Sequence, residues 1–222
     1  MASGVDLPMK RTVPLAIAAV LALPAAAFAH PHVFVEANLE IVRDESGAVI
    51  ELRHVWRFDE LFSTTVLVDF DANADNALQP EELEEVSKTV TQSIGEQEWF
   101  TEVRSGNEAV EIVGPEKIMV DYQDGQLLMF FPARFKEPVS TATAPFRVSV
   151  SDPTYYVAME IADEAAVQVT GNGASCKAEI YRPDYDKLLA ENPAALTEDF
   201  FNDPQKASLN DQWMSWITLK CA

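Results

Sequence analysis

Histidine and cysteine are scarce in this chain, which has three histidines and two cysteines among 222 residues. Hydrolytic zinc sites usually take several histidine, cysteine or carboxylate ligands, so the small number of histidines argues against such chemistry. The sequence also lacks a GxSxG nucleophile motif and a glycine-rich loop of the kind that binds phosphate groups. We therefore do not expect an enzyme.

Basic residues are also few, because 16 lysines and arginines stand against 36 aspartates and glutamates, for a formal net charge of −20. Such an acidic protein repels nucleic acid and anionic lipid, so we expect neither as a partner. The charge favours solubility, and it weakly concentrates small cations around the surface.

Long hydrophobic runs are absent after residue 29. Before that point, a basic pair at residues 10–11 precedes an apolar run at 13–27, and residues 27–29 read Ala-Phe-Ala. This pattern predicts a cleavable secretory signal peptide at residues 1–29. No later stretch approaches the roughly 20 apolar residues of a membrane helix. We therefore expect an exported mature protein, residues 30–222, with no membrane insertion after signal cleavage.

The two cysteines, Cys176 and Cys221, form an even count in an exported chain, which favours one disulfide. The bond would tie the C-terminus to a strand about 45 residues earlier and contribute roughly 3 to 4 kcal/mol to stability. A thiolate metal site is the alternative, although the chain has no CxxC pair and no nearby histidine.

Alternating apolar and polar residues predict a β-hairpin at the start of the mature chain, with strands at 32–43 and 49–58. Both strands have one apolar face. Keeping the two faces on the same side of the sheet predicts a register in which Ile41 lies opposite Ile50.

The rest of the chain predicts two helices followed by short strands. Residues 59–69 and 80–97 carry apolar side chains at helical spacing. The predicted strands lie at 109–113, 118–122, 126–131, 146–150 and 155–160, and a closing strand at 213–221. We therefore expect a single α+β domain over residues 30–222, mainly an antiparallel β-sheet. It would carry an EF-hand-like helix-loop-helix insertion at about 59–98 and a C-terminal segment tied by the disulfide.

The polar segment between the two predicted helices matches the twelve-residue calcium loop of EF-hands. Oxygen donors stand at loop positions one, three, five, seven (a backbone carbonyl), nine and twelve, as Asp71, Asn73, Asp75, Ala77, Gln79 and Glu82. Position six is Asn76 instead of the usual glycine; Asn tolerates the left-handed conformation required there, but weakens the site. A single such site predicts a Kd of about 10⁻⁴ to 10⁻³ M. The alternative is an Asx-rich turn that only caps the second helix.

The histidines suggest a second metal site. Signal cleavage would give His30 a free α-amine, which with its imidazole could chelate Zn²⁺, Ni²⁺, Co²⁺ or Cu²⁺, and His32 adds a second imidazole. Pro31 has no N–H and so excludes the N-terminal copper and nickel motif that uses deprotonated amides. The expected register places His54 opposite Ala37, about 16 Å along the strand from His32. The alternatives are a frayed terminus, and for His54 a hydrogen-bonded core histidine.

Several segments together carry a family resemblance. They are His30-Pro31-His32-Val33-Phe34-Val35, His54-Val55-Trp56-Arg57-Phe58-Asp59-Glu60, the Asp-rich loop, Trp99-Phe100-Thr101 and Asp152-Pro153-Thr154-Tyr155-Tyr156-Val157. In these segments the sequence resembles the bacterial domain-of-unknown-function family 1007. Its members are commonly described as periplasmic components of an uncharacterised transport system, often encoded beside nickel/cobalt-type permeases. The resemblance implies a metal-handling accessory role with an inner-membrane metal permease as partner.

Three functions follow from these observations. The first is a periplasmic metal-binding accessory protein of a transition-metal transport system, with a structural calcium loop. The second is a calcium-stabilised periplasmic interaction module with no transition-metal role. The third is a copper enzyme with an N-terminal histidine brace, for which His54 is the remote histidine that the sequence offers.

Overall fold

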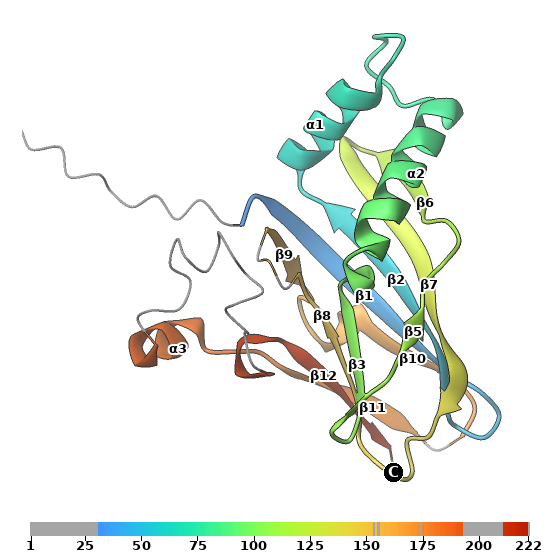
Figure 1. Cartoon of the computed structure of the whole chain (residues 1–222), viewed down its shortest axis with the longest axis vertical. Coiled ribbons are helices and arrows are strands. Elements are labelled where there is room, and N and C mark those ends of the chain that lie inside the picture. The colour runs from blue at the N-terminus through green and yellow to red at the C-terminus, as the bar shows by residue number, and fades with distance from the viewer. Residues whose placement is uncertain (1–30, 153, 155, 174, 193–210, 222) are drawn as a thin grey trace, which may run out of the picture.

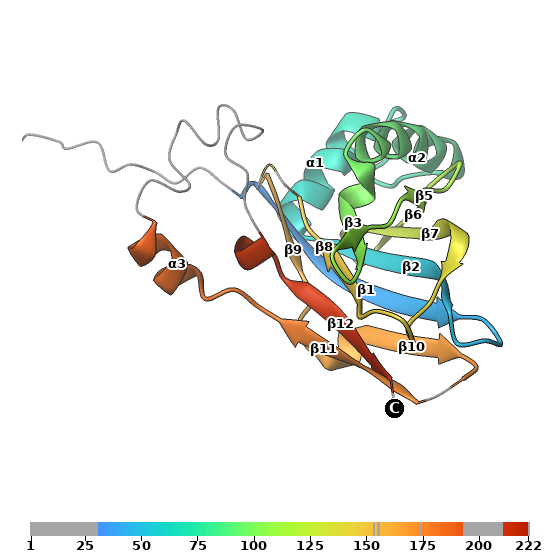
Figure 2. The same cartoon turned by 60° about the horizontal axis from the view of Figure 1, so that its bottom comes forward.

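The computed structural model describes residues 31–152, 154, 156–173, 175–192 and 211–221. The predicted signal peptide and His30 lie outside these residues. Two β-sheets pack against each other, and a pair of helices stands at one end (Figures 1 and 2). The α+β class is therefore confirmed.

The larger sheet has seven strands, in the order β10-β1-β2-β7-β5, with β9 also on β1 and β6 also on β7. Its strands are β1 (Val33–Arg43), β2 (Val49–Phe58), β5 (Ile112–Val113), β6 (Met119–Gln123), β7 (Gln126–Val139), β9 (Val157–Glu160) and β10 (Val167–Gly171). Strands β9 and β10 run parallel to β1, and the other described pairings are antiparallel. The expectation of a mainly antiparallel sheet is confirmed.

The smaller sheet has the order β11-β12-β8-β3-β4. Its strands are β3 (Thr101–Ser105), β4 (Glu108–Ala109), β8 (Phe146–Val150), β11 (Cys176–Tyr181) and β12 (Trp216–Cys221). Cys176 and Cys221 lie opposite each other in the β11–β12 register and form a disulfide. The predicted bond is confirmed, and it joins the first residue of one strand to the last residue of its neighbour.

The register of the first hairpin differs from the prediction by two residues. Ile41 lies opposite Leu52, not Ile50, and consequently His54 lies opposite Leu39, not Ala37. One residue of this difference comes from the turn, which places Arg43 opposite Val49 and not Ala48. The other comes from a bulge next to the turn, where the β1–β2 register shifts between Val42 and Arg43 and passes over Ile50. A bulge adds one residue to one strand, which the alternation of side chains alone does not reveal.

Strand β7 is longer than predicted and continues through Pro132, where the sequence suggested an end at Phe131. Proline disrupts a sheet only where its missing N–H is needed. One edge of β7 pairs with β2, and the other edge pairs with β6 and β5. On this second edge, β6 pairs only as far as Phe130, and β5 pairs with Arg134 and Phe135. Pro132 falls in the gap between these two partners, so the strand tolerates it.

Other strand boundaries also differ from the predicted ones. The strand predicted at 109–113 is divided between β4 and β5, and the closing strand begins at Trp216 after a short turn, η3 (Asp211–Trp213). The strand predicted at 155–160 covers β9. Two further short 3-10 helices are η1 (Glu98–Phe100) and η2 (Glu164–Ala166). The short helix α3 (Tyr185–Glu191) lies shortly before residues 193–210, which the structure does not describe.

The two longer helices are α1 (Glu60–Phe70) and α2 (Pro80–Gly95), close to the predicted spans. Buried hydroxyl groups fasten them to the larger sheet. The Ser63 hydroxyl accepts a hydrogen bond from the N–H of Leu127 at 2.9 Å, and the Ser87 hydroxyl donates to the carbonyl of Ile118. The loop between the helices lies at the far tip of the molecule (Figure 1).

The core lies between the two sheets and under the helices. It includes the inward apolar faces of β1, β2 and β7 together with side chains of β3, β8 and β12. Val66, Val86 and Ile94 add the inner sides of the two helices. Of the helices in the described residues, none has both the length and the apolar character needed to cross a membrane.

Candidate functional site

The 71–82 loop joins the end of α1 to the start of α2. Asp71 ends α1, with its N–H donating to the carbonyl of Leu67 at 2.9 Å, and Pro80 takes the first position of α2. Asn76 has a φ of 63°, so the left-handed conformation expected at loop position six is present. Ala74 at position four is also left-handed, with a φ of 58°.

The oxygen side chains at the start of the loop accept hydrogen bonds from its backbone. One oxygen of Asp71 accepts from the N–H of Asp75 at 3.1 Å, and the other accepts from Asn76 at 2.7 Å. Asn73 accepts from the N–H of Asp75 at 2.9 Å, and Asp75 accepts from that of Ala77 at 2.9 Å. These bonds fold the loop inward as a series of Asx turns.

The end of the loop is fixed by Glu82. One carboxylate oxygen accepts from the N–H of Ala72, and the other accepts from that of Gln79, each at 2.8 Å. The second bond caps the start of α2, while the side chain of Gln79 donates to Asp75 at 3.1 Å. The second helix is therefore capped by Glu82 and not by the Asx turns considered from the sequence.

Calcium coordination by this loop stays a prediction. In the part of the chain that the structure describes, no group of three or more His, Cys, Asp or Glu side chains is placed to hold a metal ion. The donor chemistry fits nonetheless, because an ionised carboxylate has about four acceptor positions on two oxygens. An oxygen that accepts one backbone N–H still has a lone pair for a cation.

His54 lies in the core. It is 1 % exposed, stacks on Phe131 with ring centroids 4.6 Å apart, and meets the edge of Trp56 at 5.8 Å. Within the described residues neither ring nitrogen has a hydrogen-bond partner. Burial lowers its pKa to about 3. The core location considered from the sequence is confirmed, but its expected hydrogen bond is not found among these residues.

His32 lies at the start of β1, on an exposed part of the surface. Its N–H donates to the carbonyl of Tyr156 at 2.9 Å, and the two rings lie 4.9 Å apart. Strand alternation directs the side chains of His32 and His54 to opposite faces of the sheet. The structure therefore does not bring these two histidines together, and the copper-brace hypothesis gains no support from His54.

Two of the segments behind the family resemblance meet in one aromatic cluster. Trp56 stacks on Phe100 at 6.2 Å, and Phe131 contacts both Trp56 at 4.8 Å and Trp99 at 6.3 Å. With His54 these rings fill the space between β2, β7 and the turn after α2. The sequence did not indicate these ring contacts, because the whole helix pair separates Trp56 from Trp99 and Phe100 along the chain.

The turn that supplies Trp99 and Phe100 has an unusual backbone. Three successive residues, Glu98, Trp99 and Phe100, have positive φ values of 50°, 61° and 48°. Such conformations cost roughly 1 to 2 kcal/mol per residue. Ring packing offsets this strain: Gly114 leaves room for the Trp99 indole, since a Cβ there would lie 1.8 Å from the ring.

Asp152 holds a turn. It is 5 % exposed and accepts hydrogen bonds from the N–H of Thr154 at 2.8 Å and from that of Val157 at 2.9 Å. The Thr154 hydroxyl adds a contact at 2.7 Å. These bonds direct the chain into β9, which supports a structural role for this motif.

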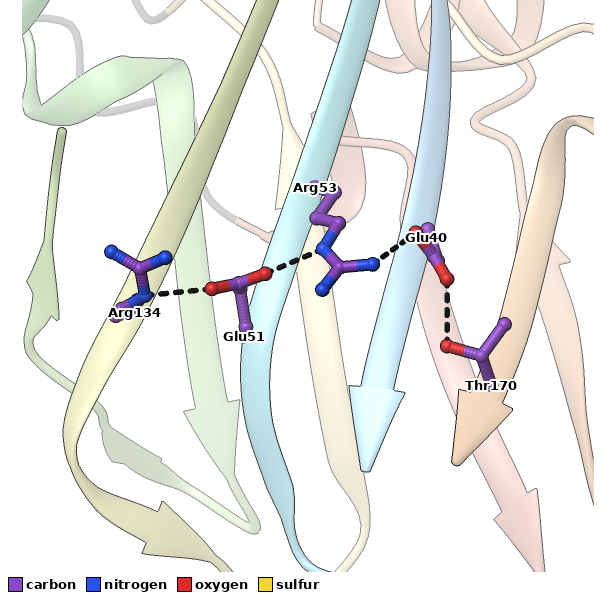
Figure 3. Close-up of polar contacts among 5 residues, drawn as sticks. All are labelled: Glu40, Glu51, Arg53, Arg134 and Thr170. Atoms are coloured by element: carbon purple, nitrogen blue, oxygen red, sulfur yellow. Dashed lines mark hydrogen bonds and ion pairs between the residues drawn. The ribbon is translucent and has the colours of Figure 1, made fainter. Parts of the chain in front are cut away.

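The sequence also did not single out a row of ion pairs on the outer face of the larger sheet. Figure 3 shows five residues from four strands: Thr170, Glu40, Arg53, Glu51 and Arg134. Arg53 contacts Glu51 at 2.5 Å and Glu40 at 3.1 Å, while Arg134 contacts Glu51 at 2.6 Å. The hydrogen bond from Thr170, at 2.7 Å, and the neighbouring Arg53 lower the pKa of Glu40. We call these five residues the ion-pair row.

The ion-pair row borders a cleft of about 480 Å³. Its apolar lining includes Val55, Met119, Phe130 and Pro132. We call this feature the outer-face cleft. Glu51 and Arg53 alternate on one strand, which is a visible sequence signal, but their partner Arg134 is 83 residues from Glu51 and depends on the β2–β7 register.

Comparison with known proteins gives a family and a distant relative. Residues 15–221 match the family described as "Protein of unknown function (DUF1007)". An uncharacterized protein of Haemophilus influenzae is 23 % identical over 195 residues, which cover 87 % of this chain and 91 % of that protein. The match therefore includes both sheets, the helix pair and the outer-face cleft.

Proposed function

This chain belongs to the DUF1007 family, and from that premise we propose a periplasmic metal-binding accessory protein of a transition-metal transport system, of the nickel, cobalt or zinc type. In this proposal the 71–82 loop holds a structural calcium ion. The geometry of that loop is the observation that carries the calcium part of the proposal, because it combines oxygen donors at the required spacing with a left-handed Asn76.

Two features of the loop support calcium binding. Asp71 and Glu82 are already drawn inward by backbone hydrogen bonds from opposite ends of the loop, so their oxygens start close to the loop interior. The ligands also join two helices. A cation between the end of α1 and the start of α2 would neutralise carboxylates that otherwise repel one another in a chain of net charge −20.

The proposed calcium ion stabilises the protein and does not act as a switch. A weak site gains occupancy only at millimolar calcium, and ligand at ten times Kd stabilises a fold by about 1.4 kcal/mol. Thermal unfolding with and without millimolar calcium tests this. We expect the midpoint to rise with calcium in the wild type and to stay constant in Asp71→Asn, which removes the charge at loop position one, where the motif requires aspartate.

Asp69→Asn is the matched control, because Asp69 is an exposed residue of α1 outside the ligand positions. This variant makes the same chemical change and should keep the calcium-dependent rise. An unchanged midpoint for the wild type at millimolar calcium would refute the calcium site. If both variants lost the calcium-dependent rise in midpoint equally, the rise would come from general charge screening and not from a calcium site.

The transition-metal part of the proposal concerns the processed N-terminus. The backbone of His32 is anchored to Tyr156, so His30 and its α-amine would lie two residues before a fixed point of the sheet. Isothermal titration of the processed protein with Zn²⁺, Ni²⁺, Co²⁺ and Cu²⁺ tests the site. Adding one residue before His30 should weaken binding if the amine is a ligand, and an unchanged affinity would refute that role.

A calcium-stabilised interaction module is the second candidate. The burial of His54 among aromatic rings favours it, because this leaves fewer accessible histidines for a transition metal. The same titrations separate the two candidates. Calcium stabilisation without transition-metal binding would support the module, whereas binding that His32→Ala weakens and His54→Leu leaves unchanged would support the accessory protein.

A further inference from the structure

The outer-face cleft is separate from both proposed metal sites. Its walls come from β1, β2, β6, β7, β10 and η2, on the side of the larger sheet opposite the core. At about 480 Å³ it lies within the range of small-molecule sites, which are clefts with mainly apolar walls and a few placed polar groups. We therefore asked which ligand its side chains would recognise.

The floor of the cleft is an apolar row that crosses three strands. Val55 on β2 lies opposite Phe130 on β7, which in turn lies opposite Met119 on β6. Met119 is 62 % exposed and Val55 is 37 % exposed. Contiguous exposed apolar side chains on a folded protein commonly mark a binding surface.

The charged side of the cleft has two arginines and two glutamates, and the arginines are the more exposed. The side chains of Arg53 and Arg134 are 53 % and 64 % exposed, whereas those of Glu40 and Glu51 are 29 % and 11 % exposed. The guanidinium groups are therefore more accessible to a ligand than the carboxylates. In a protein with more than twice as many acidic as basic residues, this surface is a local exception that favours an anionic group.

Arg134 keeps donors for such a group. A guanidinium has five N–H donors, and the ion pair with Glu51 uses Nε. Among the described residues, no contact occupies the two terminal nitrogens of Arg134, which can form a bidentate pair with a carboxylate. Glu51 accepts from both arginines and fixes the position of each guanidinium.

We propose that the outer-face cleft binds a small amphipathic carboxylate. The apolar chain of the ligand lies across Val55, Phe130 and Met119, and its carboxylate pairs with Arg134. The apolar row and Arg134 lie on adjoining parts of the same cleft, which matches a ligand with one charged end. A cationic amphiphile would instead meet the exposed guanidinium groups and be repelled.

Octanoate, octylammonium and octanol are suitable probes because they share an apolar chain and differ in charge. Backbone amide NMR spectra of the folded protein, recorded during each titration, give both affinity and location. We expect octanoate to bind at least tenfold more tightly than octylammonium, with shifts at Val55, Phe130 and Met119. Equal affinity for the two charged probes, shifts elsewhere, or no octanoate binding at millimolar concentration would overturn the proposal.

Two variants test the assigned residues. Arg134→Gln should weaken octanoate binding at least tenfold, whereas Arg57→Gln should retain wild-type affinity, because Arg57 is exposed on the same face of β2 but does not line the cleft. Equal weakening in both variants would indicate general electrostatics and overturn the assignment.

If Arg134→Gln fails to fold, Met119→Ser provides the test, since this exposed side chain contributes little to the core. It should weaken octanoate several-fold with no change in the unfolding midpoint, and wild-type affinity would overturn the role of the apolar row. Adding a calcium chelator should leave octanoate binding unchanged, which separates the outcome from that of the calcium proposal.

Discussion

His54 and Phe131 lie opposite each other on neighbouring strands of the larger sheet and stack face to face, with ring planes 12° apart. The imidazole is thus part of a hydrophobic core and is kept neutral there, because burial lowers its pKa from 6.5 to about 3. A histidine in this state makes the stability of the fold depend on pH, and it is not accessible as a metal ligand.

We expect acid to destabilise the protein through His54. Between pH 6.5 and about 3 the unfolded chain binds a proton at this imidazole that the folded chain does not bind. Stability therefore falls as pH decreases through that window, by up to about 1.4 kcal/mol per pH unit from this residue. His54→Leu should flatten the pH dependence of urea unfolding measured between about pH 4.5 and 7.5.

Leu39→Ala provides the control for this experiment. Leu39 lies opposite His54 on β1 and is 2 % exposed, so its truncation leaves a cavity next to the same site. The variant should lose about 2 to 5 kcal/mol at every pH, with the wild-type slope retained. An equally steep slope in His54→Leu and in the wild type would show that other groups dominate the acid response.

Sequence patterns were sufficient for the features that depend on neighbouring residues. The hairpin strands, both helices of the insertion and the left-handed Asn76 follow from alternation, helical spacing and turn chemistry in short windows. The features that escaped prediction depend on distant pairing. The pairing at the turn and the bulge at Ile50 together moved His54 to a new partner, and the ion-pair row needed the β2–β7 register to bring Arg134 to Glu51.

The strained turn at Trp99 depends on a glycine that makes no motif of its own. Gly114 has no Cβ to displace the indole, so Gly114→Ala should push against the ring and cost about 1 to 3 kcal/mol of unfolding free energy. The penalty should shrink in a Trp99→Leu background, since the clashing ring is absent. Urea unfolding of the four-protein cycle measures this coupling, and equal penalties in both backgrounds would contradict it.

The Cys176–Cys221 disulfide closes a span of 45 residues and joins β11 to β12. Replacing both cysteines with serine should lower the unfolding free energy by about 3 to 4 kcal/mol, because the unfolded chain regains loop entropy. A reductant should lower the stability of the wild type to a similar degree and have no effect on the double variant. A reductant effect of the same size in both proteins would place its cause elsewhere.

Asn76 offers a way to strengthen the proposed calcium loop. Its φ of 63° is free of steric cost only for glycine, whereas its N–H bond to Asp71 is a backbone contact that glycine would keep. Asn76→Gly should therefore favour the loop path and raise calcium affinity by about two- to fivefold, equivalent to roughly 0.4 to 1 kcal/mol. Isothermal calcium titration measures the change. Asn76→Ala should lower calcium affinity, because alanine keeps a Cβ but lacks the tolerance of Asn for this conformation. Weaker binding by the glycine variant would mean that loop flexibility outweighs strain at this position.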